Sequence, residues 1–477
     1  MNRQIRFVGL ISGLMVLALL ANLTYLNVVQ QSSLEANPYN VRAREAEFDV
    51  DRGQILAGNT VIAESVPTAD GSVFTYQRTY ANGPLYAPVT GFFSYIYGTS
   101  RIENSFNTDL AGTSSSQWLQ NLIDSASGRV PQGASVVTTI SPTLQQAAWN
   151  ALKGYNGAIV ALDPHTGAVK ALVTSPSYDP NLLASHDLSA VQASWQKLTT
   201  DPLDPMTDRG TREIYPPGST FKLIVASTAL EHGYTADTML DTPDELLLPG
   251  TNTYLPNSDD CGNTQLTLQR ALQLSCNTSF AKLGYTLGAD ELRQQAEKFG
   301  FDSPHLPELG GVASQFPAQM DGAELMLSSI GQYNVAANPL QMAMVAAAFV
   351  NDGQLAEPYI VQEVRAPDLS VLYSHQAAPP TQAVSASTAQ AMRDLMISVV
   401  DNGGGILAQI PGVTVGGKSG TAETDPTNPS YGWFVSFALN PDIVVAVFLQ
   451  HDVNDSTDIW GGNEAAPVAK KVLEATR

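Results

Sequence analysis

The sequence predicts an α/β (α+β) protein in which helices flank an antiparallel sheet, preceded by a small β-rich module and one transmembrane helix. Three observations predict this arrangement. Two hairpin patterns, GAIVALDPHTGAVKALVTSP and YGWFVSFALNPDIVVAVFLQ, lie at opposite ends of one long region, with helical sequence between them. Strands from both ends of a region that join one sheet imply a single domain closed by its own ends. The third observation is an uncharged apolar run near the amino end.

The apolar run predicts a transmembrane anchor over residues 7–26. Residues 7–34 carry no charge, and about 20 mostly apolar residues suffice for a helix to cross a bilayer. Because Arg3 and Arg6 lie on the short side, the positive-inside rule keeps the tail, residues 1–6, in the cytoplasm. A cleaved signal peptide is the competing interpretation, but no A-x-A site follows the run. We therefore expect a single-pass cell-membrane protein whose folded part is extracytoplasmic.

The segment 35–135 is expected to form a separate, β-rich module. The stretch VDRGQILAGNTVIAES alternates apolar and polar residues around a Gly58-Asn59 turn, which predicts short strands. The segment ends in RVPQGA, which has the composition of a linker.

The segment 138–477 is expected to form the α/β domain. Its first part, SPTLQQAAWNALKG, begins with a Ser-Pro helix-start signal and predicts a helix that ends at Gly154. The two hairpins turn at DPHTG and at Asn440-Pro441, and EAAPVAKKVLEA predicts a closing helix.

Composition excludes several classes of function. The chain has 477 residues, of which 44% are apolar and 14% charged, so it can bury a sizeable core. Its formal net charge of -21 would repel nucleic acid, which is not expected as a partner. With no H-E-x-x-H and no C-x-x-C, we expect neither a metal site nor another cofactor.

Cys261 and Cys276 are the only two cysteines, and a disulfide can persist in an exported domain. If joined, they close a loop of about 15 residues, which the chain-entropy model values at roughly 3 kcal/mol. Two small buried thiols are the alternative.

The pattern S-x-x-K occurs three times, at Ser219/Lys222, Ser194/Lys197 and Ser279/Lys282. Only the first follows residues that cannot continue a helix backwards, the Pro-Pro-Gly of YPPGSTFKLI, so a helix is expected to begin near Ser219. A hydroxyl at a helix start lies near unpaired N–H groups and a positive dipole, which suits a developing oxyanion. Ser194 and Ser279 lie within helical runs instead.

Serine becomes a strong nucleophile only when a base takes its proton, and a lysine serves if its pKa falls toward neutrality. Burial among Phe221, Leu223 and Ile224, together with a second nearby cation, would lower the pKa of Lys222. The mechanism therefore predicts a second lysine close to Lys222.

The stretch Lys418-Ser419-Gly420-Thr421 is the only K-[ST]-G in the chain. The overlapping GVTVGGKS also satisfies the P-loop pattern of nucleotide-binding proteins, which requires a following helix. Here the following GTAETDPTNPSY has two prolines and no apolar periodicity. The alternation in IPGVTVGGKSGTA favours an edge strand, and Lys418 is expected to remain charged in an open groove at that edge.

The third element is Ser275-Cys276-Asn277, which offers a hydroxyl and a carboxamide on a turn between helical runs. S-x-N is weak alone, because Ser105 and Asn107 repeat it. The specific signal is the ordered set: S-x-x-K at a helix start, then S-x-N, then a unique K-[ST]-G in a strand.

This set resembles that of the penicillin-binding proteins and serine β-lactamases. VDRGQILAGNTVIAES is similar to the start of the N-terminal module of monofunctional, class B penicillin-binding proteins. YPPGSTFKLI, SIGQYNVAANPLQMAMVAAAFVNDGQLAEPYIV and KSGTAET are similar to their transpeptidase domain. In length and layout the chain is most similar to the penicillin-binding protein A group. The resemblance implies a transpeptidase-like domain over 138–477 and a dimerisation or pedestal module over 35–135.

The resemblance also implies a role for each motif residue. Two positions depart from the family pattern: Cys276 stands inside S-x-N, and GQYN replaces the more usual Gly-Gln-Gly. The N–H groups of Ser219 and Thr421 would form the oxyanion hole. The implied roles are Ser219 as acylated nucleophile, Lys222 as its base, Ser275 as proton relay to the leaving amine, Asn277 as holder of the substrate amide, Lys418 as stabiliser of developing charge, and Ser419, Gly420 and Thr421 as substrate-binding residues.

The implied activity is that of a D,D-transpeptidase that cross-links peptidoglycan stem peptides and is acylated by β-lactams. The residues before the domain are too few for a fused glycosyltransferase, so a polytopic membrane glycosyltransferase is the implied partner. A D,D-carboxypeptidase or a β-lactamase on the same fold is the alternative within the enzyme class. A non-catalytic β-lactam sensor or division scaffold is the alternative from another class.

Overall fold

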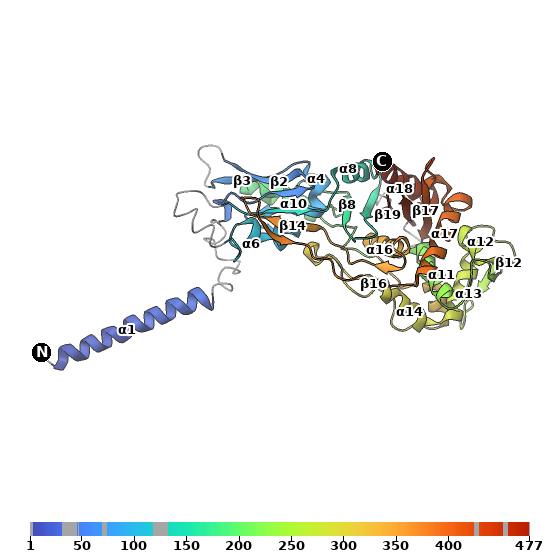
Figure 1. Ribbon diagram of the computed structural model, residues 1–477, viewed down its shortest axis with the longest axis horizontal. Helices are drawn as coiled ribbons and strands as arrows, with labels where there is room; N and C mark the ends of the chain where they lie inside the picture. Colours follow the sequence, from blue (N-terminus) through green and yellow to red (C-terminus); the bar gives the residue numbers. More distant parts are fainter. Residues whose placement is uncertain are drawn as a thin grey trace.

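The computed structural model describes residues 3–30, 45, 47–68, 74–117, 132–423, 429–451 and 457–476. Helix α1, Arg3–Val28, stands apart from the rest of the protein in Figure 1. Within it, Ile5–Leu26 is long and apolar enough to cross a membrane, and none of its most apolar window is buried. Residues 1–2 of the expected tail and residues 35–44 of the expected module lie outside the described residues.

The sheet nearest α1 in the chain has six strands, in the order β15-β14-β6-β1-β2-β3. The turn at Gly58-Asn59 joins β1 to β2, as predicted. The expectation of a separate module is wrong in one respect, because two strands of this sheet come from inside the segment 138–477. The strands are β1 Ile55–Ala57, β2 Thr60–Pro67, β3 Tyr76–Tyr80, β6 Ser135–Thr138, β14 Val361–Arg365 and β15 Val371–Ser374.

The central sheet has five antiparallel strands in the order β17-β18-β19-β7-β8. The two predicted hairpins form it together with the K-S-G strand, which lies at the edge as predicted. The register pairs Val447 of β19 with Ile159 of β7, which joins the two ends of the domain. The strands are β7 Asn156–Leu162, β8 Val169–Ser175, β17 Thr414–Ala422, β18 Tyr431–Leu439 and β19 Ile443–Gln450.

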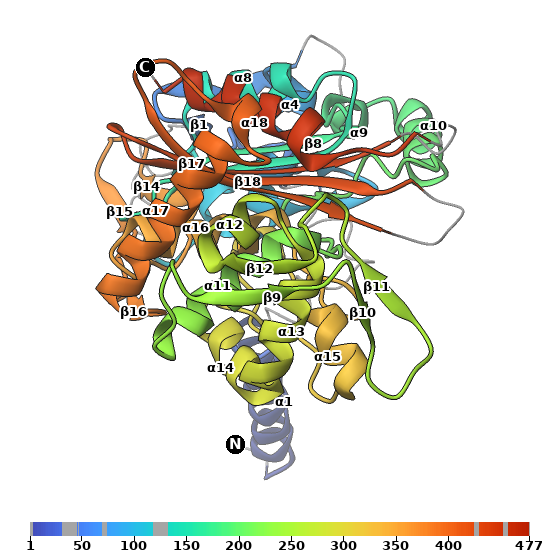
Figure 2. The ribbon, with the colours of Figure 1, turned by 90° about the vertical axis from the view of Figure 1, so that its right-hand side faces the viewer.

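Helices cover both faces of the central sheet (Figure 2). On one face lie α8, Pro142–Ala151, and α18, Ala466–Glu474. The Ser141 side chain accepts a hydrogen bond from the N–H of Leu144, which confirms the predicted start of α8. On the other face lies α16, Pro339–Val350, all of whose residues are buried.

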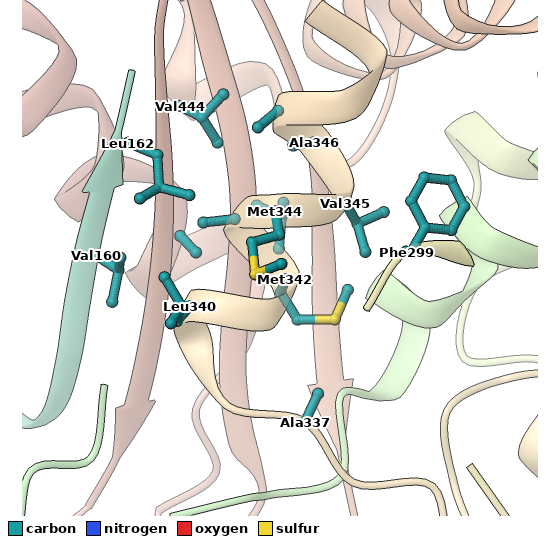
Figure 3. Packing of buried hydrophobic residues seen from close by; sticks show 14 of the residues in the cluster. Val160, Leu162, Phe299, Ala337, Leu340, Met342, Met344, Val345, Ala346 and Val444 are labelled. Carbon is teal, nitrogen blue, oxygen red and sulfur yellow. The ribbon is translucent and has the colours of Figure 1, made fainter. Parts of the chain in front are cut away.

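Alternate residues of the strands face the two layers. Val444 of β19 packs in the same core as Val160 and Leu162 of β7, whereas Val445 joins the core under α8 and α18. Figure 3 shows Val160, Leu162 and Val444 directed toward Met344 of α16. Period-two alternation therefore gives one sheet two apolar faces, each covered by helices.

A helical subdomain lies beside the α16 face and carries the remaining motif residues (Figure 2). Its helices are α11 Lys222–Glu231, α12 Leu268–Gln273, α13 Asn277–Leu287, α14 Ala289–Lys298, α15 Gly322–Ser328 and α17 Ala386–Asn402, with the 3-10 turns η1 Gly218–Phe221, η2 Pro307–Leu309 and η3 Ile406–Ala408. Its strands are β9 Met239–Thr242, β10 Glu245–Leu247, β11 Tyr254–Pro256, β12 Thr264–Thr267, β13 Gln354–Leu355 and β16 Thr381–Gln382.

The other short elements are the helices α4 Gly83–Thr90, α5 Arg101–Ser105, α6 Asn107–Leu110, α9 Asn181–Ala184 and α10 Leu188–Thr199, the strands β4 Phe93–Ser94 and β5 Gly98–Thr99, and the π-helical turn η4 Gly461–Ala465.

Candidate active site

Ser219 lies at a helix start that is braced against the edge strand. The 3-10 turn η1 leads directly into α11, which confirms the predicted helix start. Gly218 has φ 54°, and a Cβ there would lie 2.6 Å from the carbonyl oxygen of Thr421. Strand β18, the neighbour of β17, also holds the turn, because its Trp433 Nε1 donates a 3.0 Å hydrogen bond to Pro216 O. Only glycine fits before Ser219, and the nucleophile candidate is fixed beside β17.

Lys222 is fully buried, one turn after Ser219. Its Nζ lies 2.7 Å from both Ser275 O and Asn277 Oδ1. Burial and, after it, the nearby charge of Lys418 lower the pKa of Lys222 well below its usual value, against an opposing effect of Asp259. The predicted second lysine is thus present. A neutral amine has two N–H groups and one lone pair; these two oxygens take both N–H groups, which leaves the lone pair free to accept a proton.

Ser275 joins the two lysines. It lies between α12 and α13 at φ 59°, a left-handed conformation that is uncommon for a residue with a side chain. Its Oγ accepts a 2.9 Å hydrogen bond from Lys418 Nζ and lies 3.3 Å from Lys222 Nζ. Because such strained conformations persist only where the surroundings hold them, the position of this hydroxyl is strongly determined.

Lys418 enters the site from β17 and differs from the sequence-based expectation. We expected a charged lysine in an open groove at the strand edge, but its exposed fraction is 0%. Burial lowers the pKa of Lys418 to about 7, with Asp259 opposing the shift. The open-groove expectation failed because α17 and η1 both contact β17. Besides Ser275, its Nζ donates to Ser419 O at 2.9 Å.

The residues that follow Lys418 in β17 lie close to the turn that carries Ser219. A Cβ on Gly420 would lie 2.9 Å from Pro217 O, so the strand approaches the nucleophile turn closely. Ser419 and Thr421 are half-buried, and Thr421 Oγ1 accepts a hydrogen bond from Gly461 N at 3.3 Å. The next described element after β17 is strand β18, so the P-loop arrangement of strand, loop and helix is not present there.

A disulfide joins Cys261 to Cys276, with 6.0 Å between the Cα atoms. It ties the loop of residues 257–261 to the S-x-N motif. This loop contains a residue that sequence analysis missed, Asp259, whose charge acts on both lysines. Its only signal in the sequence is its place two residues before Cys261.

The stretch GQYN, residues 331–334, contacts the turn that carries Ser219. Gly331 O accepts a 3.0 Å hydrogen bond from Gly218 N, and a Cβ on Gly331 would lie 2.0 Å from Gly218 O. Tyr333 replaces the glycine expected from the family pattern, yet it has φ 61°, in the region that favours glycine. Its hydroxyl donates to Glu324 Oε1 at 2.6 Å.

The competing motif copies lie elsewhere. Ser194 is within α10, and Ser279 is within α13 with Lys282 paired to Asp241 instead. Ser105 donates to Glu308 O at 2.8 Å, away from the two lysines. The structure therefore gathers Ser219, Lys222, Ser275, Asn277 and the Lys418 to Thr421 stretch, and none of the copies.

A serine at a helix start, beside two buried lysines that meet at one hydroxyl, defines a serine-dependent acyl-transfer enzyme. The family model for the penicillin binding protein transpeptidase domain matches residues 157–474, and the model for the penicillin binding protein A dimerisation domain matches residues 52–136. The chain belongs to the penicillin-binding protein transpeptidases, as its motifs predicted.

Relatives of known name agree with this assignment. The chain is 40% identical to the peptidoglycan D,D-transpeptidase PbpA of Mycolicibacterium smegmatis, over 100% of this chain and 99% of the relative. Its fold matches penicillin-binding protein A from M. tuberculosis in the ceftriaxone acyl-enzyme complex with a TM-score of 0.86 and 39% identity, covering 90% of this chain and 99% of the other. The penicillin G acyl-enzyme complex of that protein matches with a TM-score of 0.84, 39% identity and the same coverage.

Proposed function

We propose that this chain is a membrane-anchored D,D-transpeptidase that cross-links peptidoglycan stem peptides through an acyl-serine intermediate and is acylated by β-lactams. The observation that carries the proposal is the meeting of two buried lysines at Ser275 Oγ beside the Ser219 turn. The names of the relatives support the same reaction.

In the acylation step, Ser219 Oγ attacks the carbonyl carbon of the penultimate D-Ala. Lys222 takes the Ser219 proton on its free lone pair and returns a proton to Ser275 Oγ, 3.3 Å away, as Ser275 gives its own proton to the departing D-Ala nitrogen and the C–N bond breaks. Lys418 donates to Ser275 Oγ, which leaves the Ser275 proton free for the leaving group. The N–H groups of Ser219 and Thr421 stabilise the oxyanion.

The remaining motif residues hold the substrate. Asn277 binds a backbone amide of the donor peptide, while the Ser419-Gly420-Thr421 stretch binds its terminal carboxylate next to Lys418. The acyl group then passes to an amine of a neighbouring stem peptide. Attack by water instead of an amine gives the carboxypeptidase reaction, so the amine must outcompete water at this site.

The proposal extends to the layout of the chain. Residues 7–26 anchor the protein, residues 1–6 lie in the cytoplasm, and everything beyond the membrane is extracytoplasmic. Residues 35–135, together with β14 and β15 contributed by the transpeptidase domain, residues 138–477, form a pedestal or dimerisation module. A polytopic membrane glycosyltransferase supplies the glycan strands.

Fluorescent penicillin tests the central claim. We expect covalent labelling of the full-length protein, with the adduct mapped by mass spectrometry to Ser219, and no labelling of the Ser219→Ala variant. Ser279→Ala, which removes a hydroxyl from another S-x-x-K copy, is the matched control and should label normally. An adduct on Ser194 or Ser279 would falsify the assignment, and acylation without turnover of a stem-peptide donor would favour the sensor alternative.

A further inference from the structure

The loop of residues 257–261 is attached at both of its ends to the S-x-N motif or to the residue that follows it. At one end, Asn277 Nδ2 donates to Pro256 O at 3.2 Å and to Ser258 Oγ at 3.3 Å. Asn257 Oδ1 accepts from Thr278 N at 3.0 Å. At the other end the disulfide joins Cys261 to the middle residue of the motif. Asp259 stands between these two attachments.

Asp259 is an exposed carboxylate on this loop. Among the residues that the structure describes, no hydrogen bond or ion pair to its side chain is found. Its charge nevertheless acts on both buried lysines, since it raises the pKa of Lys222 and of Lys418 against the effect of burial. A negative charge is therefore held near the lysine pair, on a loop that is attached to Cys276 and Asn277.

The reaction brings a cation to this position. The departing nitrogen leaves beside Ser275, and by microscopic reversibility the attacking nitrogen of the acceptor must enter at the same place. Primary amines arrive from neutral water as ammonium ions. The loop of residues 257–261 is attached to Cys276 and Asn277, the two residues that follow Ser275, so it borders this path.

We propose that Asp259 binds the ammonium group of the acyl acceptor and thereby favours cationic amines over water and uncharged nucleophiles. The inference rests on the proposed transpeptidase function and assigns one residue to the binding of its acceptor, a primary amine that carries positive charge in solution. The disulfide and the Asn277 contacts hold the carboxylate in place for this purpose.

The transfer step balances as follows. The bound ammonium first releases one proton to solvent, and the neutral amine attacks the acyl carbon. A C–N bond forms and the C–Oγ bond to Ser219 breaks. The second proton of the nitrogen passes through Ser275 and Lys222 to Ser219 Oγ, which restores the free enzyme.

A partition experiment on the full-length protein tests the inference. The enzyme is acylated by a D-alanyl thioester donor and offered either Nα-acetyllysinamide, whose side chain is an ammonium, or hydroxylamine, which is uncharged at neutral pH. The ratio of aminolysis to hydrolysis is independent of the acylation rate because both products come from one acyl-enzyme. We expect Asp259→Asn to lower the preference for the charged acceptor over hydroxylamine about two- to fivefold, as for loss of an exposed ion pair.

Two variants serve as controls. Asp260→Asn removes the same charge one residue away and is expected to keep the wild-type preference, while Asp259→Glu is expected to retain most of it. An unchanged preference in Asp259→Asn, or an equal loss in Asp260→Asn, would overturn the inference while leaving acylation of Ser219 intact. Failure of the wild-type enzyme to form an acyl-enzyme would instead overturn the proposed function, and this inference with it.

Discussion

At the level of single residues, the proposed mechanism depends on unequal protonation of two lysines. Burial and the charge of Lys418 both depress the pKa of Lys222. The proposed mechanism needs neutral Lys222, so the acylation rate should fall as the pH drops through that pKa. Replacing Lys418 by Met removes the neighbouring cation, and the pKa of Lys222 should rise. The acid limb of the acylation rate is therefore expected to move to higher pH in Lys418→Met.

The rate of labelling by fluorescent penicillin is measured across the pH range. The quantity compared is the pH at which the rate reaches half of its maximum on the acid side, and not the maximal rate. Lys222→Arg is the companion variant. Guanidinium does not deprotonate in proteins, so acylation should fall by about 10² to 10⁴ at every pH. An acid limb of Lys418→Met at the wild-type pH or below it would show that Lys222 is not the base.

Tyr333 provides a second prediction at this scale, because its φ of 61° suits glycine. Both Tyr333→Gly and Tyr333→Ala lose the hydrogen bond to Glu324, so the two variants differ only at the backbone. Left-handed backbone costs a residue with a Cβ about 1 kcal/mol or more. We expect the glycine variant to unfold at higher urea concentration than the alanine variant. Equal midpoints would mean that the surroundings relax this φ.

At the level of elements, the loop before Cys261 depends on the disulfide. A closed loop with a sequence separation of 15 residues is worth about 3 kcal/mol in the chain-entropy model. The double variant Cys261→Ser, Cys276→Ser should lose about that much unfolding free energy, measured in urea. Alkylation of the native wild-type protein without reductant should modify no cysteine, and two modified cysteines would contradict the prediction.

How far the sequence predicted these elements depends on how local their signals are. The start of α8 and the turn before Ser219 follow from residues within a few positions of each other, and the structure has both. The pairing of Val364 in β14 with Val136 in β6 has no local signal, because it joins residues far apart in the chain. For the same reason the burial of Lys418, which depends on elements packed over its strand, was not predicted.

At the scale of the whole molecule, one chain combines a helix suited to lipid with a domain that carries most of the negative charge. The most apolar part of the span Ile5–Leu26 has a mean hydropathy of 2.1, and none of that part is buried inside the protein. The formal charge of -21 belongs to the whole chain, whereas Arg3 and Arg6 precede the apolar run. Basic residues beside a span, and not the net charge of the chain, set its orientation, so Arg3 and Arg6 favour a cytoplasmic amino end and an extracytoplasmic site.

Protease protection tests that orientation on intact spheroplasts of cells that produce the full chain. Protease added from outside should remove the transpeptidase domain and, with it, all labelling by fluorescent penicillin, because the proposed orientation leaves only the tail before the helix inside. A cytoplasmic protein in the same sample must remain intact, which controls for leakage. Basic residues beside a span set its orientation, so in the full chain with Arg3 and Arg6 both replaced by Glu a part of the transpeptidase domain should become protected from protease. Survival of the wild-type domain in intact spheroplasts would reverse the orientation, and recovery of a mature chain beginning near residue 25 would replace the anchor with a cleaved signal peptide.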